Sequence, residues 1–349
     1  MMYSRMFINQ LKIKYKEAFK LAKKNKKKIA FTIGNTAKLE KSNYFFTPIR
    51  ISEKLIIFGI VVFSEKIVLE ACKFLDGKID IVFADSEKKI FPKKNGAPGN
   101  IERRVRENIK HTKVFTFKGN DLTVDAINLL VDQYFNYDLR GVAGKKIGII
   151  GAGNIGSKVA LYLTEKGAKV FLNRRNLSKL KKISTAINLI KPSNTNEKAK
   201  ISSKIRLSKN ADVLIGSTDG IPVITKEMVQ VLKPESIIID SGKGTLKNDA
   251  ITCANERKIK IFRVDIFPSL EGLISKSISM EKQIKKYKKF KTIKNITIIN
   301  TGKLGKYGDV VVDDVDKPNI VYGICNGRGD FIRKVPKKYR KFINKFKIN

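Results

Sequence analysis

Apolar residues recur with two different periods along the chain, and the two periods mark strands and helices in turn. Short apolar runs rich in β-branched and aromatic residues predict strands, whereas apolar residues at helical spacing predict helices. In the first part, strands are expected at KIAFTIG, KLIIFGIVVF, IDIVFAD and KVFTFKG, with helices at IVLEACKFLDG, NIERRVRENIK and LTVDAINLLVDQYF. This alternation is typical of a mostly parallel sheet covered on both faces. Residues 3–24 predict a further helix, either packed on the domain or bound to a surface through its basic face.

The same alternation continues after DLRGVAG, which we interpret as a linker. Further strands are expected at KKIGII, AKVFLN, ADVLIGS, SIIID, IKIFRVDI and NITIIN, with helices between them. The last fifty residues differ, because short apolar segments (DVVVDD, NIVYGIC, DFIRK) are separated there by Gly and Asp. We expect a small β element closed by the basic helix KKYRKFINKFKIN.

A glycine-rich segment joins the strand KKIGII to the following helix. The segment has the spacing GxGxxG. We expect five of its residues to bind the cofactor: Gly151, Gly153, Asn154, Ile155 and Gly156. The first glycine permits a tight turn, the second lets backbone approach a pyrophosphate, and the third lets the helix pack on the strand. The helix N-terminus supplies N–H groups and a partial positive charge for phosphates.

The next strand ends at Asn173-Arg174-Arg175. NAD-preferring sites usually carry Asp or Glu at this point to bind the ribose hydroxyls. Here no carboxylate repels a 2′-phosphate and two guanidinium groups could bind one. We therefore predict NADP as the cofactor, with NAD as the second option; the other interpretation is that both arginines simply face solvent.

Residues 139–267 resemble the Rossmann domains of two-domain NAD(P)-dependent dehydrogenases. In those families the stretch ADVLIGSTDG, with Ser217, Thr218 and Asp219, lines the nicotinamide side of the cofactor. The order of domains is similar to that of the shikimate dehydrogenase and glutamyl-tRNA reductase-like group. That resemblance implies a catalytic Lys and Asp from the first domain, and it places Lys94 (or Lys93) and Asp121 or Asp125 at those positions.

The segment IIDSGKGTLKNDAITCANERKIKIFRVDIF is similar to the D-2-hydroxyacid dehydrogenases. That likeness puts Lys243 at the position of their catalytic Arg. Their catalytic His should follow NITIIN, but the residues there are Asn300-Thr301-Gly302. Because the chain has a single histidine, His111, their usual acid–base route is closed to it.

These observations together predict an α/β fold class in three parts. We expect an N-terminal parallel-sheet substrate domain over 1–138, a Rossmann dinucleotide-binding domain over 139–300 and a C-terminal β element with a basic helix over 301–349. The last part could cover the substrate cleft or pair two subunits as a homodimer.

The amino-acid composition bears on the expected partners, on metal binding and on membrane spans. The net charge of +40 suggests a polyanionic partner, but 58 of the 72 basic residues are lysines, and nucleic-acid readers favour Arg. We therefore attribute most of this charge to a solvated, lysine-rich surface and keep a nucleic-acid partner only as an alternative. Three widely spaced cysteines without a CxxC predict reduced cytoplasmic thiols and no metal site, and the longest apolar run, LIIFGIVVF, is too short to span a membrane.

The predicted function is oxidation or reduction of a small carbonyl or hydroxyl metabolite, with hydride transfer in the interdomain cleft. Lys94, Asp121, Asp125 and Lys243 are the candidate proton donors or acceptors. Three alternatives stay open. They are a lyase, hydrolase or cyclodeaminase-type enzyme with tightly bound NAD, a non-catalytic NAD(P)-sensing protein, and a nucleic-acid binder.

Overall fold

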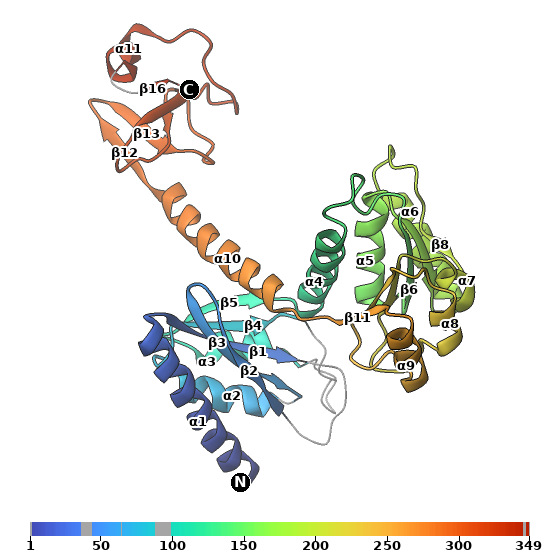
Figure 1. Cartoon of the computed structure of the whole chain (residues 1–349). Helices are drawn as coiled ribbons and strands as arrows, with labels where there is room; N and C mark the ends of the chain where they lie inside the picture. Colours follow the sequence, from blue (N-terminus) through green and yellow to red (C-terminus); the bar gives the residue numbers. More distant parts are fainter. Residues whose placement is uncertain (1, 36–43, 64, 88–98, 345–346, 349) are drawn as a thin grey trace. The chain divides into compact units, whose positions relative to one another are not determined.

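The computed structural model describes residues 2–35, 44–63, 65–87, 99–344 and 347–348. The chain divides into two compact units, Met1–Glu271 and Gly272–Asn349. The first unit contains a five-stranded and a six-stranded sheet, and the second contains another five-stranded sheet (Figure 1). The α/β fold class is therefore confirmed, whereas the predicted domain limits at 138 and 300 stay predictions.

The first sheet has the strand order β2-β3-β1-β4-β5, and all its neighbouring strands are parallel except β2 and β3. Its strands are β1 (Lys28–Asn35), β2 (Tyr44–Ile51), β3 (Leu55–Val62), β4 (Ile81–Asp85) and β5 (Lys113–Phe117). Strands β3 and β4 are almost wholly buried, as their continuous apolar sequences require.

The sequence patterns did not predict strand β2, because this strand contains Pro48. Proline cannot donate to a ladder, so it argues against a central strand but is tolerated at an edge or bulge. Strand β2 lies at the edge of the sheet, and its register with β3 shifts between Thr47 and Arg50, where Pro48 lies.

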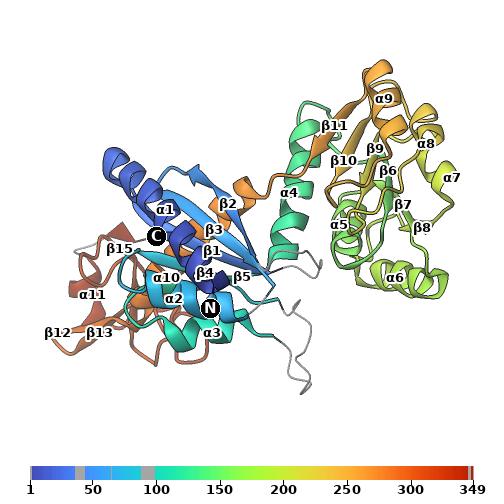
Figure 2. The same cartoon turned by 90° about the horizontal axis from the view of Figure 1, so that it is seen from below.

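Three helices pack against this sheet: α1 (Met2–Asn25), α2 (Glu65–Leu75) and α3 (Ile101–Asn108) (Figure 2). Phe7 and Leu11 of α1 are fully buried in the core of the first sheet. The N-terminal helix is therefore a packed element, which favours the first of its two interpretations.

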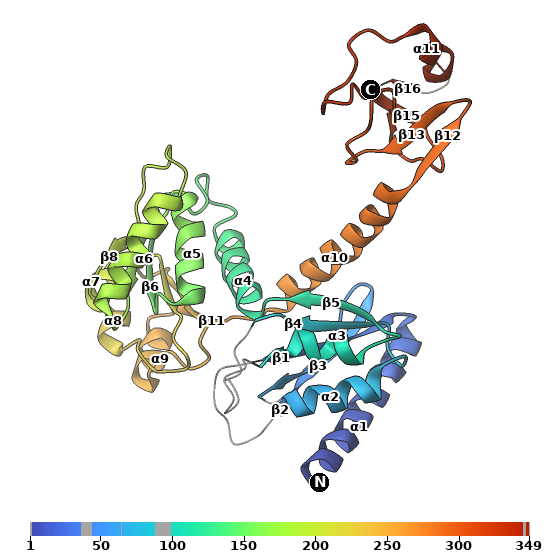
Figure 3. The ribbon, with the colours of Figure 1, turned by 180° about the vertical axis from the view of Figure 1, so that it is seen from behind.

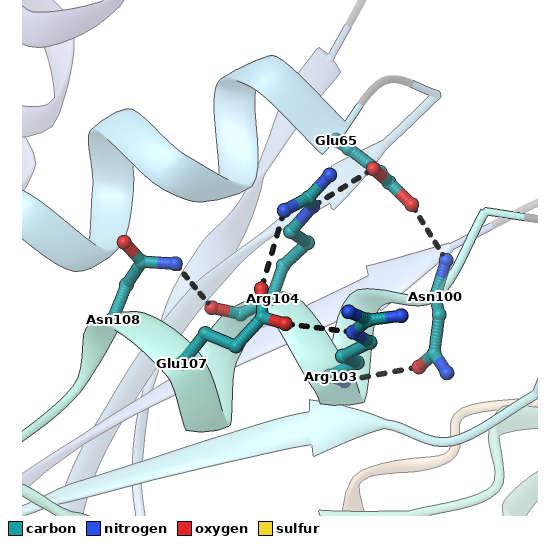
Figure 4. Close-up of polar contacts among 6 residues, drawn as sticks. All are labelled: Glu65, Asn100, Arg103, Arg104, Glu107 and Asn108. Atoms are coloured by element: carbon teal, nitrogen blue, oxygen red, sulfur yellow. Dashed lines mark hydrogen bonds and ion pairs between the residues drawn. The ribbon is translucent and has the colours of Figure 1, made fainter.

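An ion-pair network fastens α3 to the start of α2 (Figure 4). The Glu65 carboxylate accepts hydrogen bonds from Arg104 Nε at 2.9 Å and from the Asn100 backbone N–H at 2.8 Å. Glu107 accepts from both Arg103 and Arg104, and the Asn100 side chain caps α3 through the Arg103 N–H. These arginines are paired with carboxylates, so they do not form an anion-binding cluster.

The second sheet has the order β11-β10-β9-β6-β7-β8, and every neighbouring pair is parallel. Numbered from its first strand, this is the 3-2-1-4-5-6 order of dinucleotide-binding sheets. Its strands are β6 (Lys146–Ile150), β7 (Lys169–Asn173), β8 (Lys200–Ile201), β9 (Val213–Gly216), β10 (Ile237–Asp240) and β11 (Lys260–Arg263).

Helices cover both faces of this second sheet. One face packs against α4 (Gly119–Tyr134), α5 (Asn154–Glu165) and α6 (Leu177–Ile190), and α4 lies beside α5 (Figure 3). The other face packs against α7 (Lys204–Ser208), α8 (Lys226–Gln230) and α9 (Asn248–Glu256). Both faces of the sheet are therefore apolar. Polar side chains that could bind a ligand lie in the loops that follow the carboxyl ends of the strands.

The second unit contains most of α10 (Phe267–Lys288), α11 (Lys337–Ile343) and a mixed sheet of order β12-β13-β14-β15-β16. Its strands are β12 (Phe290–Ile293), β13 (Ile296–Asn300), β14 (Val310–Val312), β15 (Ile320–Ile324) and β16 (Lys347–Ile348). The predicted strand NITIIN is β13. It pairs in this third sheet and not in the Rossmann sheet, because the hairpin turn Lys294-Asn295 joins it to β12.

The search for membrane spans returned none: no helix in the described part of the chain is both long and apolar enough to cross a bilayer. Across the same residues, no group of three His, Cys, Asp or Glu side chains could hold a metal ion.

Candidate cofactor site

The three glycines after β6 have three different surroundings. A Cβ added to Gly151, which has φ +99°, would lie 2.2 Å from the Ser217 carbonyl oxygen. A Cβ on Gly156 would lie 2.4 Å from the Gly151 carbonyl oxygen. At Gly153 the nearest such atom is 3.9 Å away. The first and third glycines are therefore required by packing, whereas the space beside Gly153 is open.

Helix α5 begins at this open space. Gly153 is its N-cap residue and provides no side-chain capping hydrogen bond. Asn154 and Ile155, the first two helical residues, line a cavity of ≈ 470 Å³ together with Gly151 and Gly153. An uncapped helix N-terminus that faces a cavity is suited to bind a phosphate group. The residues present thus fit the pyrophosphate of a dinucleotide.

The end of β7 borders the same cavity. Asn173 Nδ2 donates to the Ser202 carbonyl at 2.8 Å, and Arg174 Nη1 donates to the Ala152 carbonyl at 2.7 Å. Arg175 is exposed and also lines the cavity. Of the two arginines, Arg174 is therefore positioned by the phosphate loop itself.

Six cavity-lining residues were not predicted from the sequence: Asn120, Ile150, Asn176, Lys204, Ile221 and Val223. Lys204 opens α7 and Asn120 lies in the first turn of α4, and both border the cavity. Among 58 lysines Lys204 had no distinguishing pattern, and only the pairing of β7 with β8 brings its segment beside Asn173.

The loops that follow strands β9 and β10 complete the surroundings of the cavity. Ser217, Thr218 and Asp219 follow β9 and line the cavity, as the resemblance implied. The loop after β10 presses against them, since a Cβ on Gly242 would lie 1.8 Å from the Thr218 carbonyl oxygen. The buried Asp240 carboxylate holds this second loop by accepting the N–H groups of Gly244 and Thr245.

Lys243 lies in the loop that Asp240 holds. It is exposed and adopts φ +54°, a conformation uncommon for a residue with a side chain. Such backbone conformations persist only where the surroundings impose them, and they concentrate at functional sites. Of the three candidates that the structure describes, Lys243 belongs to a loop that contacts the cavity lining, and Asp121 is the chain neighbour of the cavity-lining Asn120.

The other three candidates have different surroundings. Asp121, in the first turn of α4, pairs with Lys158 of α5 and with Lys118 at 2.9 Å. Burial raises the pKa of Asp121, but the hydrogen bonds and charges of Lys158 and Lys118 outweigh it, so the pKa is lowered overall. Asp125 is exposed on α4, and Lys94 lies outside the described residues, as does Lys93.

The single histidine and the thiols contribute no chemistry here. His111 is exposed, and its backbone N–H donates to Asp76. All three cysteines are buried and free. Burial and the nearby Asp76 carboxylate raise the pKa of the Cys72 thiol to about 12, which keeps it protonated and unreactive.

Comparison with known proteins agrees with this geometry. Residues 128–300 match the family model of the D-isomer specific 2-hydroxyacid dehydrogenase NAD binding domain. This region is therefore similar to the NAD-binding domains of those dehydrogenases. The resemblance to NAD-binding dehydrogenases that the sequence suggested is thereby confirmed, whereas the likeness to shikimate dehydrogenases stays a prediction.

Solved structures offer only distant likenesses. A dipicolinate synthase chain from Bacillus halodurans is 15% identical, with a TM-score of 0.36 over 64% of this chain and 71% of that chain. D-lactate dehydrogenase from Escherichia coli is 13% identical, with a TM-score of 0.33 over 60% and 73%. L-tryptophan dehydrogenase from Nostoc punctiforme is 12% identical, with a TM-score of 0.42 over 71% and 72%. At such scores the likeness carries no functional information, and no curated protein matches the sequence.

The sequence resemblance to the D-2-hydroxyacid dehydrogenases placed their catalytic histidine after NITIIN, and the matched region ends there. Asn300 stands there, almost completely buried in the third sheet. Its side chain accepts the Val315 N–H at 3.0 Å and donates to the Lys286 carbonyl at 2.6 Å. Because both ends of this amide are engaged in backbone hydrogen bonds, Asn300 is a structural residue.

Proposed function

We propose that the protein is an NADP(H)-preferring oxidoreductase that acts on a small carbonyl or hydroxyl metabolite. The observation that carries this proposal is the arginine pair at the end of β7. Arg174 is fixed to the phosphate loop through the Ala152 carbonyl, and Arg175 and Lys204 border the same cavity. Three cations and no carboxylate at the ribose end favour a 2′-phosphate over a free hydroxyl.

The phosphate loop would hold the pyrophosphate through the backbone of Gly153, Asn154 and Ile155. Asn173, Arg174 and Arg175 would bind the adenosine ribose and its phosphate, and Ser217, Thr218 and Asp219 the nicotinamide ribose. When bound, the nicotinamide donates or accepts the hydride. The role of this chain is to orient the cofactor and to supply or remove one proton.

Lys243 is the residue that we favour for the proton transfer. Its loop follows the carboxyl end of a parallel strand, which is where ligands bind in such sheets. Asp121 is ionised and already engaged by two ammonium groups, so it is better placed to position Lys158 and Lys118 than to transfer a proton itself. Catalytic roles for Lys94 and Asp125, a cytoplasmic location and a homodimer stay predictions.

A second function, NAD(P) sensing without catalysis, is favoured by one observation. The described residues that line the cavity include no histidine, and the only carboxylate among them is the exposed Asp219. A sensor would bind the cofactor at the same residues but turn over no metabolite.

A metabolite screen distinguishes the two functions. Purified protein saturated with NADPH or NADP is mixed with small carbonyl and hydroxyl compounds while the absorbance of the reduced nicotinamide is followed. Turnover that is absent in Gly153→Asp supports an oxidoreductase, since the new carboxylate fills the open space beside the helix. Binding of the cofactor without turnover of any compound favours the sensor.

A further inference from the structure

The C-terminal unit carries more positive charge than the rest of the chain. Its 78 residues contain 20 Lys and Arg against six Asp and Glu, a net charge of +14. The preceding 271 residues carry +26, so the charge per residue nearly doubles. The net charge of the whole chain does not reveal this difference between the units. A lysine content that was raised equally along the whole chain would not produce it.

Most acidic residues of this unit form ion pairs or hydrogen bonds with other residues of the same unit. Lys286 and Lys289 pair with Asp314 and Asp316. Asp313 accepts the backbone N–H groups of Asn319 and Ile320. The remaining lysines are therefore not neutralised by these carboxylates.

The third sheet has two unlike faces. On one face, Ile298 and Val310 pack with Tyr339 and Ile343 of α11. On the other face, the buried cluster consists of Ile299, Val311 and Cys325 with Tyr322 beside it, and it includes no helical residue.

This second face holds a hollow of ≈ 310 Å³. Tyr322 and Phe331 line it together with Leu304, which is 78% exposed. The Phe331 ring lies over Gly323, where a Cβ would meet it at 2.6 Å. Asp330 also borders the hollow, and its carboxylate accepts the Phe331 N–H at 2.7 Å.

An exposed aromatic residue joins this hollow to a group of lysines. Phe290 pairs across the strands with Ile299, so it belongs to the same face, and it is 64% exposed. Lys303, which lines the apolar hollow, lies 5.4 Å from the centre of the Phe290 ring.

Phe290 also borders a second hollow, of ≈ 390 Å³, with Lys288, Lys291 and the ion pair between Lys289 and Asp316. Lys291 pairs across the strands with Ile298, so it belongs to the face that α11 covers and not to the face of Phe290. No carboxylate pairs with Lys288, Lys291 or Lys303 among the described side chains.

We propose that this surface, formed by Phe290, Lys288, Lys303, Tyr322 and Phe331, binds single-stranded nucleic acid. Aromatic rings on an open sheet face stack with bases, and surrounding lysines bind the backbone phosphates. The aromatic residues lie beside hollows in a sheet, which suits a flat base, whereas membrane-surface elements present an amphipathic helix. The surface shares no residue with the cofactor site.

The test is fluorescence anisotropy of the full chain with a labelled 12-nucleotide single-stranded RNA. We expect binding that weakens with salt. Phe290→Ala should weaken binding about fivefold or more, whereas Phe290→Tyr, which keeps the ring, should not. The double variant Lys288→Glu/Lys303→Glu should lose binding and flatten the salt dependence.

The matched control is Lys181→Glu/Lys182→Glu, which makes the same change in net charge on exposed positions of α6. If this control loses as much binding as Lys288→Glu/Lys303→Glu, the interaction is a general charge effect and the proposal is wrong. No binding of the RNA, or binding to phosphatidylserine vesicles without binding of the RNA, overturns it as well. Circular dichroism and urea unfolding verify that each variant is folded.

Discussion

Arg174 Nη1 donates a hydrogen bond to the carbonyl oxygen of Ala152 at 2.7 Å. This bond ties the end of the second Rossmann strand to the middle of the phosphate loop. The guanidinium is thereby held at the cavity before any cofactor arrives, which lowers the entropic cost of binding a phosphate.

The arginine pair provides the first prediction. Replacing both residues, in Arg174→Ala/Arg175→Ala, should weaken NADPH binding about 100-fold or more, because each lost charge-assisted contact contributes roughly 1.5–3 kcal/mol. NADH binding should change less than about threefold. Titration calorimetry with both nucleotides measures this. Equal losses for the two nucleotides would mean that the arginines do not recognise the 2′-phosphate.

Alanine substitutions at two glycines of the phosphate loop should have different effects, one on stability and the other on cofactor binding. Gly156→Ala should destabilise the fold by about 1–3 kcal/mol, because its Cβ meets the Gly151 carbonyl oxygen at 2.4 Å. Gly153→Ala should unfold at nearly the wild-type urea concentration but bind NADPH more weakly, since its Cβ enters only the open space. Urea unfolding and nucleotide titration are compared for the two variants. A strongly destabilised Gly153→Ala would contradict the geometry.

Lys243 should affect turnover more than binding. For a substrate found in the screen, Lys243→Ala should lower kcat by about 10²–10⁴ while the affinity for NADPH stays constant. Lys247→Ala is the matched control, because Lys247 is another exposed lysine a few residues away. An unchanged kcat in Lys243→Ala would exclude it as the proton donor.

Asp121 makes stability depend on pH. Because its pKa is lowered in the folded state, its ion pairs stabilise the protein above the pKa of the unfolded carboxyl, about 4, and this contribution is lost as the pH falls through the lowered value. Asp121→Asn should therefore be less stable than wild type at pH 7 and equally stable near pH 2. The side chain is 40% exposed, so screening limits the difference to less than about 1 kcal/mol. A difference that persists at pH 2 would show that the effect is not ionic.

Sequence patterns predicted most of the fold, because strands buried on both faces leave continuous apolar runs such as those of β3 and β4. They failed at β2, where an edge position tolerates Pro48, and at β13, whose partners are set by a hairpin and by distant strands. They located the phosphate loop because two of its glycines are required sterically and all three have a fixed spacing. They could not find Lys204 or the surroundings of Asp121, since those contacts depend on how separate helices and strands come together.

The central claim is that the Rossmann domain prefers NADPH, and direct titration of wild-type protein with NADPH and NADH under one set of conditions tests it. We predict that NADPH binds at least about tenfold more tightly, and that the preference largely disappears in Arg174→Ala/Arg175→Ala. Equal affinities, or tighter binding of NADH, would contradict it.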